Sequence, residues 1–138
     1  MSNFVATAQH ITSEGAQAAI AASVAEAQKQ GWAFSIAVTD TSGDLLAFYR
    51  MEGAARVSGD AAILKARTTA RFGAPSRKLH EMLDAGNLAV LTLPGVAPLG
   101  GGVPILYGKK MIGAIGVSGG ALEDDIQVAK AGAAAAIA

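Results

Sequence analysis

Two pairs of short alternating segments constrain the fold of this chain more than any other feature. The first pair is Phe34–Asp40 and Leu45–Arg50, and the second is Val103–Tyr107 and Met111–Val117. Within each segment, side chains alternate between two faces with a period of two, which is typical of strands. A short turn containing glycine separates the members of each pair, as in β-hairpins. The sequence therefore predicts two hairpins and an antiparallel sheet.

Helical patterns lie before, between and after these hairpins. Small apolar residues recur every three or four positions in 12–30, and capping residues and glycines delimit 58–72 and 77–85. A last helix follows Gly120, with an inner stripe of Ile126, Ala129, Ala133 and Ile137. Leu88–Leu93 is a short apolar run that predicts a fifth strand. Hairpins combined with helices indicate an α+β domain whose helices pack on the faces of an antiparallel sheet.

The bulk properties exclude several classes of function. A chain of 138 residues predicts one domain, 1–138, and a formal charge of zero argues against nucleic acid as a partner. Without cysteines the chain has no disulfides, thiolate nucleophiles or thiolate metal sites. Neither a signal peptide nor an apolar run of about 20 residues is present, so we expect a cytoplasmic protein without a membrane partner.

The low content of charge predicts self-association. Charged residues make up 16% of the chain, below the roughly 25% that is usual, while 51% of residues are hydrophobic. So few charges leave apolar surface uncovered in a small domain. We therefore expect a homo-oligomer.

The segment Lys65–Phe72 carries the clearest functional pattern. Lys65, Thr68, Thr69 and Phe72 share one stripe of the predicted helix, and Arg71 lies on a neighbouring stripe. With Arg67, Arg77 and Lys78, five of the eleven basic residues lie close together in sequence. The segment predicts either a solvated basic face or one wall of a pocket for a small anionic ligand. Lys65 is then an anion anchor, or else a buried structural partner of Asp40 or Asp60.

Two further segments are candidates for the same pocket. Gly100, Gly101 and Gly102 predict a loop whose backbone approaches something closely, although a flexible turn is the alternative. Arg50 ends a predicted strand and Met51 follows it, so Arg50 can hold an anion or form a surface salt bridge with Glu52 or Asp44.

His80 is the central titratable residue of the short third helix. Glu81 and Asp84 lie near it on that helix, so the three can form a weak metal site, orient a histidine base, or make a polar face. Lys65, His80 and Asp40 are the acid–base candidates for catalysis. No nucleophile elbow, zinc motif or dinucleotide fingerprint is present.

Five stretches resemble one known family, the GlcG/HbpS-like haem-binding domains that also occur at the C-terminus of PduO-type proteins. They span nearly the whole chain in the order of the family: Ile36–Leu45, Arg50–Ala54, Lys65–Phe72, Gly101–Ile105 and Ile112–Gly120. The resemblance implies a profilin-like fold, with a five-stranded antiparallel sheet, helices on both of its faces, and a multi-subunit assembly.

The resemblance implies haem, or a related small anionic molecule, as the ligand of an accessory protein, with no other cofactor. His10 and His80 are the candidate haem ligands, Met51 and Met82 are weaker ones, and Arg50, Lys65 and Arg71 are candidates to pair with the propionates. The alternative hypothesis is a cofactor-independent isomerase or lyase that acts on a small organic acid, because a desolvated Lys65 can act as a base.

Overall fold

The computed structural model describes residues 2–137, and its elements follow the predicted order with one exception. The chain forms, in order, α1 (Ser13–Gln30), β1 (Ser35–Thr39), β2 (Leu45–Arg50), α2 (Ser58–Phe72), α3 (Arg77–Asp84), the 3₁₀ helix η1 (Leu88–Thr92), β3 (Gly102–Tyr107), β4 (Lys110–Ser118) and α4 (Leu122–Ala135).

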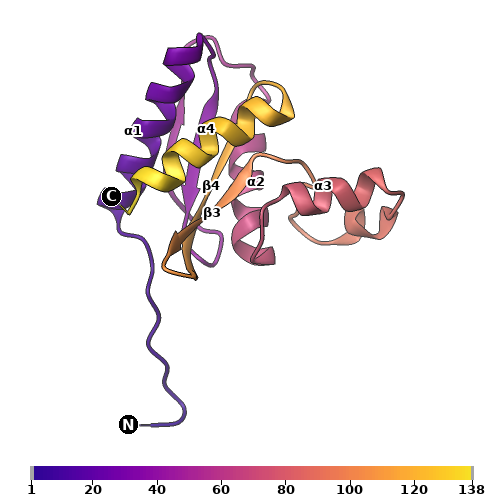
Figure 1. Ribbon diagram of the computed structural model, residues 1–138. Coiled ribbons are helices and arrows are strands. Elements are labelled where there is room, and N and C mark those ends of the chain that lie inside the picture. Colours follow the sequence, from indigo (N-terminus) through magenta and orange to yellow (C-terminus); the bar gives the residue numbers. More distant parts are fainter. Residues whose placement is uncertain (1, 138) are drawn as a thin grey trace.

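The sheet has four strands in the order β2-β1-β4-β3, and every neighbouring pair is antiparallel. Both predicted hairpins, β1–β2 and β3–β4, are therefore confirmed. The predicted fifth strand, and with it the five-stranded sheet, is wrong. The exception is η1, which lies in a lobe beside α3 and away from the sheet (Figure 1). Without a neighbouring strand, this apolar run satisfies its backbone hydrogen bonds locally.

Helices cover both faces of the sheet, as predicted. α1 and α4 pack against each other over one face, and α2 packs on the other (Figure 1). Ile36, Val38, Ile115 and Val117 point toward α1 and α4, where small residues of those helices complete the main core. The sequence stripe of α1 is confirmed, whereas Ile137 of the predicted α4 stripe is 48% exposed.

Glycine allows α2 to lie unusually close to the sheet. Ala37 of β1 packs on Ala62 and Ala66 of α2. A Cβ on Gly116 of β4 would collide with the carbonyl oxygen of Ala62 and would lie 2.5 Å from the backbone nitrogen of Ala66. Glycine within a strand is typical of a close approach by another element, and at Gly116 that element is α2.

The first residues leave the body of the molecule. Residues 2–10 are all exposed and form an arm, with a turn at Asn3–Phe4, that points away from the sheet and helices (Figure 1). The arm begins where the backbone N–H of Ile11 donates to the carbonyl of Ile112. Within residues 2–137, no helix is long and apolar enough to cross a membrane.

Candidate functional site

Lys65 lies at the centre of a polar cluster at one end of the sheet. Its side chain runs from α2 past the end of β4, where Nζ donates to the carbonyl of Val117 at 3.0 Å and to Oδ2 of Asp125 at 2.9 Å. The Lys65 and Asp125 side chains are only 5% and 4% exposed. Lys65 thus has a buried structural partner, but the suggested partners Asp40 and Asp60 are wrong: the carboxylate comes from α4.

Asp125 is held from two sides. Its Oδ1 accepts a hydrogen bond from the backbone N–H of Gly120 at 3.0 Å, while Oδ2 binds Lys65. Burial raises the pKa of Asp125 above its ordinary value, although the ammonium of Lys65 and the Gly120 N–H act in the opposite direction. The pair links α2 to the first turn of α4, two elements on opposite faces of the sheet.

Sequence reasoning missed Asp125, although one signal was present. Asp125 lies one helical turn before Ala129, a member of the predicted inner stripe of the last helix. An acidic residue on an inner stripe requires a buried cationic partner. In the sequence, Glu123, Asp124 and Asp125 form a run of acidic residues that is typical of a helix N-terminus. That general explanation did not distinguish Asp125 from its two neighbours.

His80 holds the glycine loop over this cluster. The backbone N–H of Gly100 donates to Nδ1 of His80 at 3.0 Å, so Nδ1 carries no proton. The neutral ring therefore has its proton on Nε2, which lies 3.8 Å from Oδ2 of Asp84. A histidine that binds a metal through Nε2 needs its proton on Nδ1 instead. His80 therefore positions the glycine loop through Nδ1, and its role as a haem ligand stays a prediction.

These groups line a small pocket, which we call the Lys65 pocket. Its volume is about 240 Å³, and its walls are Lys65, His80, Leu99, Gly100, Ser118, Gly120, Leu122 and Asp125. Lys65, His80 and Gly100 were candidates from the sequence, and the fold brings them together. Gly101 passes so close that a Cβ there would lie 3.0 Å from Nζ of Lys65. The glycine run therefore does approach other groups closely, as predicted.

The remaining residues of the predicted ligand wall do not line this pocket. Arg50 is exposed at the end of β2, and Phe72 is 46% exposed at the end of α2. Met51 is buried, and its sulfur accepts a hydrogen bond from the backbone N–H of Phe34 at 3.4 Å. Thr68 donates to the carbonyl of Leu64 and accepts from the N–H of Ala97.

Three other polar candidates also lie outside this pocket. Two of them bind backbone groups of a nearby turn, and the third has no hydrogen-bond partner among the described residues. Arg71 donates to the carbonyl of Ser42 at 3.1 Å, at the β1–β2 turn. Asp40 caps the same turn, because its Oδ1 accepts from the backbone N–H groups of Ser42 and Asp44. Thr69 is buried, and its hydroxyl has no hydrogen-bond partner within residues 2–137. Roles of these residues in binding stay predictions.

His10, the other imidazole, lies in a different environment. It is exposed at the base of the arm beside a second depression of about 430 Å³, which we call the His10 groove. The groove is lined by Gln9, His10, Ile11, Thr12, Gly15, Tyr107, Ile112, Ala136 and Ile137. Neither ring nitrogen of His10 has a hydrogen-bond partner among the described residues. Beyond Tyr107, Lys109 lies in the exposed β3–β4 turn and Lys110 begins β4.

No protein cluster suitable for a bare metal ion forms within residues 2–137. The suggested grouping of His80, Glu81 and Asp84 is therefore not a metal site. His80 and Asp84 approach to 3.8 Å, and Glu81 lies 4.0 Å from Arg77 instead.

Comparison with known proteins gives a consistent family likeness. Residues 11–134 match the family described as "Haem degrading protein HbpS-like". The chain is 43% identical over 108 residues to Protein GlcG of Escherichia coli K12, covering 78% of this chain and 81% of that protein. The crystal structure of Klebsiella pneumoniae protein ORFY superposes with a TM-score of 0.93 at 27% identity, covering 100% and 98% of the two chains. That of a PduOC:heme complex superposes at 0.82 and 25% identity, covering 91% and 94%.

Proposed function

The chain belongs to the HbpS-like family, and from this premise we propose that it is an accessory protein that binds haem or a related small anionic molecule. The family description and the haem complex of a structural neighbour support haem-related binding in general. We propose a cytoplasmic location and one functional domain for this protein. The choice of site within the chain rests on the geometry of its two histidines.

The His10 groove suits haem better than the Lys65 pocket. Sites for ligands of drug size or larger have volumes of roughly 300–1,000 Å³. The Lys65 pocket, at about 240 Å³, falls below this range, and the His10 groove, at about 430 Å³, lies within it. The groove is open and largely apolar, and it offers an imidazole and a phenol, both of which occur as haem ligands in proteins. The free imidazole of His10 carries this proposal.

Within the groove, each group has a definite role toward haem. His10 would hold the iron, and Ile112 and Ile137 would contact the apolar macrocycle. Lys109 and Lys110 are the nearest cations in sequence for the propionates. Lys65 is unsuited to that role because Asp125 already balances its charge. Bound haem would supply iron for redox or oxygen chemistry, and the chain would orient it and limit its contact with water.

Haem titration of histidine variants tests the proposal. We expect the wild type to develop a Soret band, and His10→Ala to shift that band and weaken binding by about tenfold. His80→Ala is the matched control and should leave the band unchanged, because His80 is held by Gly100. A wild type without any spectral change would remove the haem proposal. A band altered only by His80→Ala would place the site elsewhere.

A second function is favoured by the Lys65 pocket. There Lys65, His80 and Asp125 surround a space large enough for a small organic acid. A buried carboxyl group with a raised pKa that shares a pocket with a histidine is suited to proton transfer. We propose a cofactor-independent isomerase or lyase as the alternative, with His80 and Asp125 as the acid–base groups. Asp40, the earlier candidate, caps a distant turn.

Turnover of small hydroxy and unsaturated acids without added cofactor tests this alternative. His80→Gln should then lower kcat by roughly 10²–10⁴-fold, the usual contribution of a general acid–base group. Asp40→Asn, at the turn, is the control and should retain full activity. Equal activity in both variants would exclude His80 from the chemistry, and no turnover by the wild type on any such acid would leave binding as the function.

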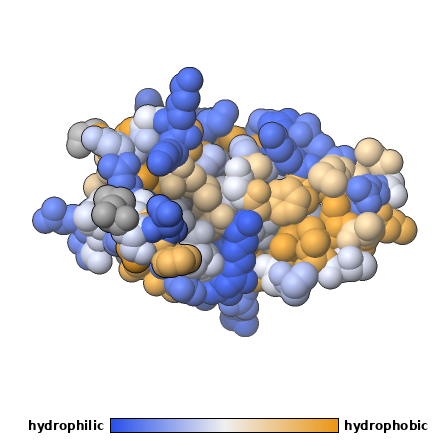
Figure 2. Space-filling model, turned by 90° about the horizontal axis from the view of Figure 1, so that it is seen from below, coloured by the Kyte–Doolittle hydropathy of each residue, from blue (hydrophilic) through white to orange (hydrophobic). Residues whose placement is uncertain are grey.

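Apolar surface supports the proposal of a homo-oligomer. The lobe of α3 and η1 exposes Met82, Leu88, Leu91, Leu93 and Leu99, which are 38–66% exposed. Figure 2 shows this end of the molecule as its largest continuous apolar area in that view. Burying such an area between copies is favourable in proportion to the apolar surface removed from water. Sedimentation equilibrium measures the resulting mass.

A further inference from the structure

The N-terminal arm has the composition of a segment that packs on a partner. From Ser2 to Ser13 the sequence contains no acidic residue, lysine or arginine. Phe4 is 97% exposed and Val5 is 68% exposed, although both are strongly apolar. An aromatic side chain held fully in water gains free energy when another surface covers it. The arm therefore presents apolar groups that its own chain does not cover.

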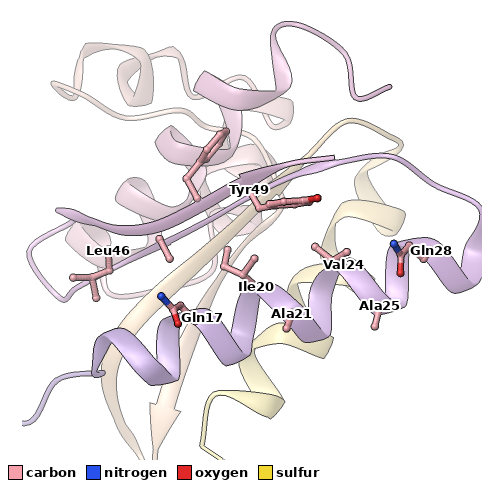
Figure 3. A pocket seen from close by; sticks show the side chains of 10 residues that line it. Gln17, Ile20, Ala21, Val24, Ala25, Gln28, Leu46 and Tyr49 are labelled. Carbon is pink, nitrogen blue, oxygen red and sulfur yellow. The ribbon is translucent and has the colours of Figure 1, made fainter. Parts of the chain in front are cut away.

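A groove of matching character lies on the opposite side of the domain from the lobe. It runs between α1 and the edge strand β2, has a volume of about 540 Å³, and is the largest of the depressions described (Figure 3). Ile20 and Val24 of α1 face it together with Tyr49 of β2, and Gln17 and Gln28 mark its two ends (Figure 3). No charged side chain lines it. Arm and groove thus both lack charged side chains, and both carry exposed apolar groups.

The strand beside the groove has one free edge. β2 is the outermost strand of the sheet, and within residues 2–137 its strand partner is β1 alone. Five of its six residues are exposed. An exposed edge can accept an additional extended segment through backbone hydrogen bonds, with pockets for alternate side chains. In an extended segment Phe4, Ala6 and Ala8 would face one side and Val5 and Thr7 the other. The apolar first set can then face a groove beside the strand edge.

The length of the arm also fits. Residues 2–9 reach roughly 26 Å when extended, at about 3.3 Å per residue, and the six residues of β2 span about 20 Å. In this structure the arm points away from its own groove (Figure 1). The structural likeness to Klebsiella ORFY covers the whole chain, arm included. An arm of this length that leaves its own body is able to reach a second molecule.

We propose that the N-terminal arm of one copy of this chain docks in the α1–β2 groove of a second copy, as a strand added to the free edge of β2. Phe4 then buries its side chain against α1 of the partner, Val5 faces the opposite side of the added strand, and the uncharged lining avoids the cost of desolvating ions. The interaction joins copies by exchange of arms; it uses residues N-terminal to Gln9 and His10 of the His10 groove, and it does not involve the Lys65 pocket.

Self-association of point variants tests this interface. Ala21 and Ala18 are both exposed on α1, but only Ala21 lines the groove. Ala21→Glu and Phe4→Asp should each weaken self-association by roughly tenfold or more, measured by sedimentation across a dilution series. Ala18→Glu is the matched control and should behave as the wild type. All three sites are exposed, so circular dichroism should show an unchanged fold.

Cross-linking locates the contact directly, because the chain has no native cysteine. Ala6→Cys in one chain and Ala21→Cys in a second, tagged chain should join through a short bis-maleimide into a mixed dimer. Ala18→Cys in place of Ala21→Cys should give far less product. A wild-type mass of 13.8 kDa at tens of micromolar, or equal effects at Ala18 and Ala21, would overturn the proposal.

Discussion

Lys65→Met is expected to lower the free energy of unfolding by about 3–5 kcal/mol, the usual cost of removing one partner of a buried ion pair. The substitution keeps most of the bulk of the side chain but leaves the Asp125 carboxylate buried without its cation. It also removes the hydrogen bond to the Val117 carbonyl. Thermal and urea unfolding measure the loss, which a role of Lys65 confined to ligand binding would not produce.

The pH dependence of this variant provides an internal check. Burial already raises the pKa of Asp125 above its unfolded value, and loss of the Lys65 ammonium raises that pKa further. As the pH falls through the folded pKa, the folded state takes up a proton that the unfolded chain does not yet bind, so stability recovers. The deficit should therefore be largest near neutral pH and shrink in mild acid.

Two further variants separate this mechanism from a general loss of packing. Lys78→Met, at an exposed position of α3, should change stability by no more than about 0.5 kcal/mol. Asp125→Leu combined with Lys65→Met removes both charges and should be more stable than Lys65→Met alone. A Lys65→Met protein that melts like the wild type would show that the pair does not stabilise the fold.

Gly116→Ala is expected to be comparably destabilising, by about 3 kcal/mol, at the upper end of the usual cost of overpacking a core. The added methyl group would collide with the backbone of α2 at Ala62 and Ala66. Backbone atoms cannot move aside like the end of a flexible side chain, so α2 must shift away from the sheet. Because Lys65 lies on α2, this shift also displaces the Lys65 pocket.

Gly59→Ala is the matched control for Gly116→Ala. Gly59 lies in α2 itself, and its nearest neighbour would be the ring of Phe48 at 3.4 Å, an ordinary contact. Alanine also forms helix more readily than glycine, so stability should be unchanged or slightly raised. If the two variants melted at the same temperature as the wild type, the tight contact between α2 and β4 would have no energetic importance.

Local patterns determined most of the elements of this protein. Alternation and short glycine turns specify the two hairpins, and the stripe of small residues in 12–30 specifies a helix that packs on a sheet. These patterns involve residues near one another in sequence, so they can be recognised before the fold is known.

Leu88–Leu93 shows where local pattern fails. A short apolar run fits a strand or a buried helical turn equally well, and the choice depends on whether a strand edge is within reach. The lobe carries this segment away from the sheet, so it forms η1. The tertiary arrangement therefore determines the structure of this segment, and the sheet has four strands instead of the expected five.

The candidate site, too, was partly predictable from the sequence and partly determined by the fold. The sequence singled out Lys65, His80 and the glycine run, because unusual residue types in a nearly neutral chain are visible without a structure. Only the fold could select Asp125 as the partner of Lys65, since 60 positions separate the two residues. Likewise, only the fold shows that Nδ1 of His80 accepts a hydrogen bond from Gly100, whereas His10 has no hydrogen-bond partner among residues 2–137. The chemical type of a side chain is known from the sequence. Its protonation, burial and partners depend on distant segments that folding brings into contact.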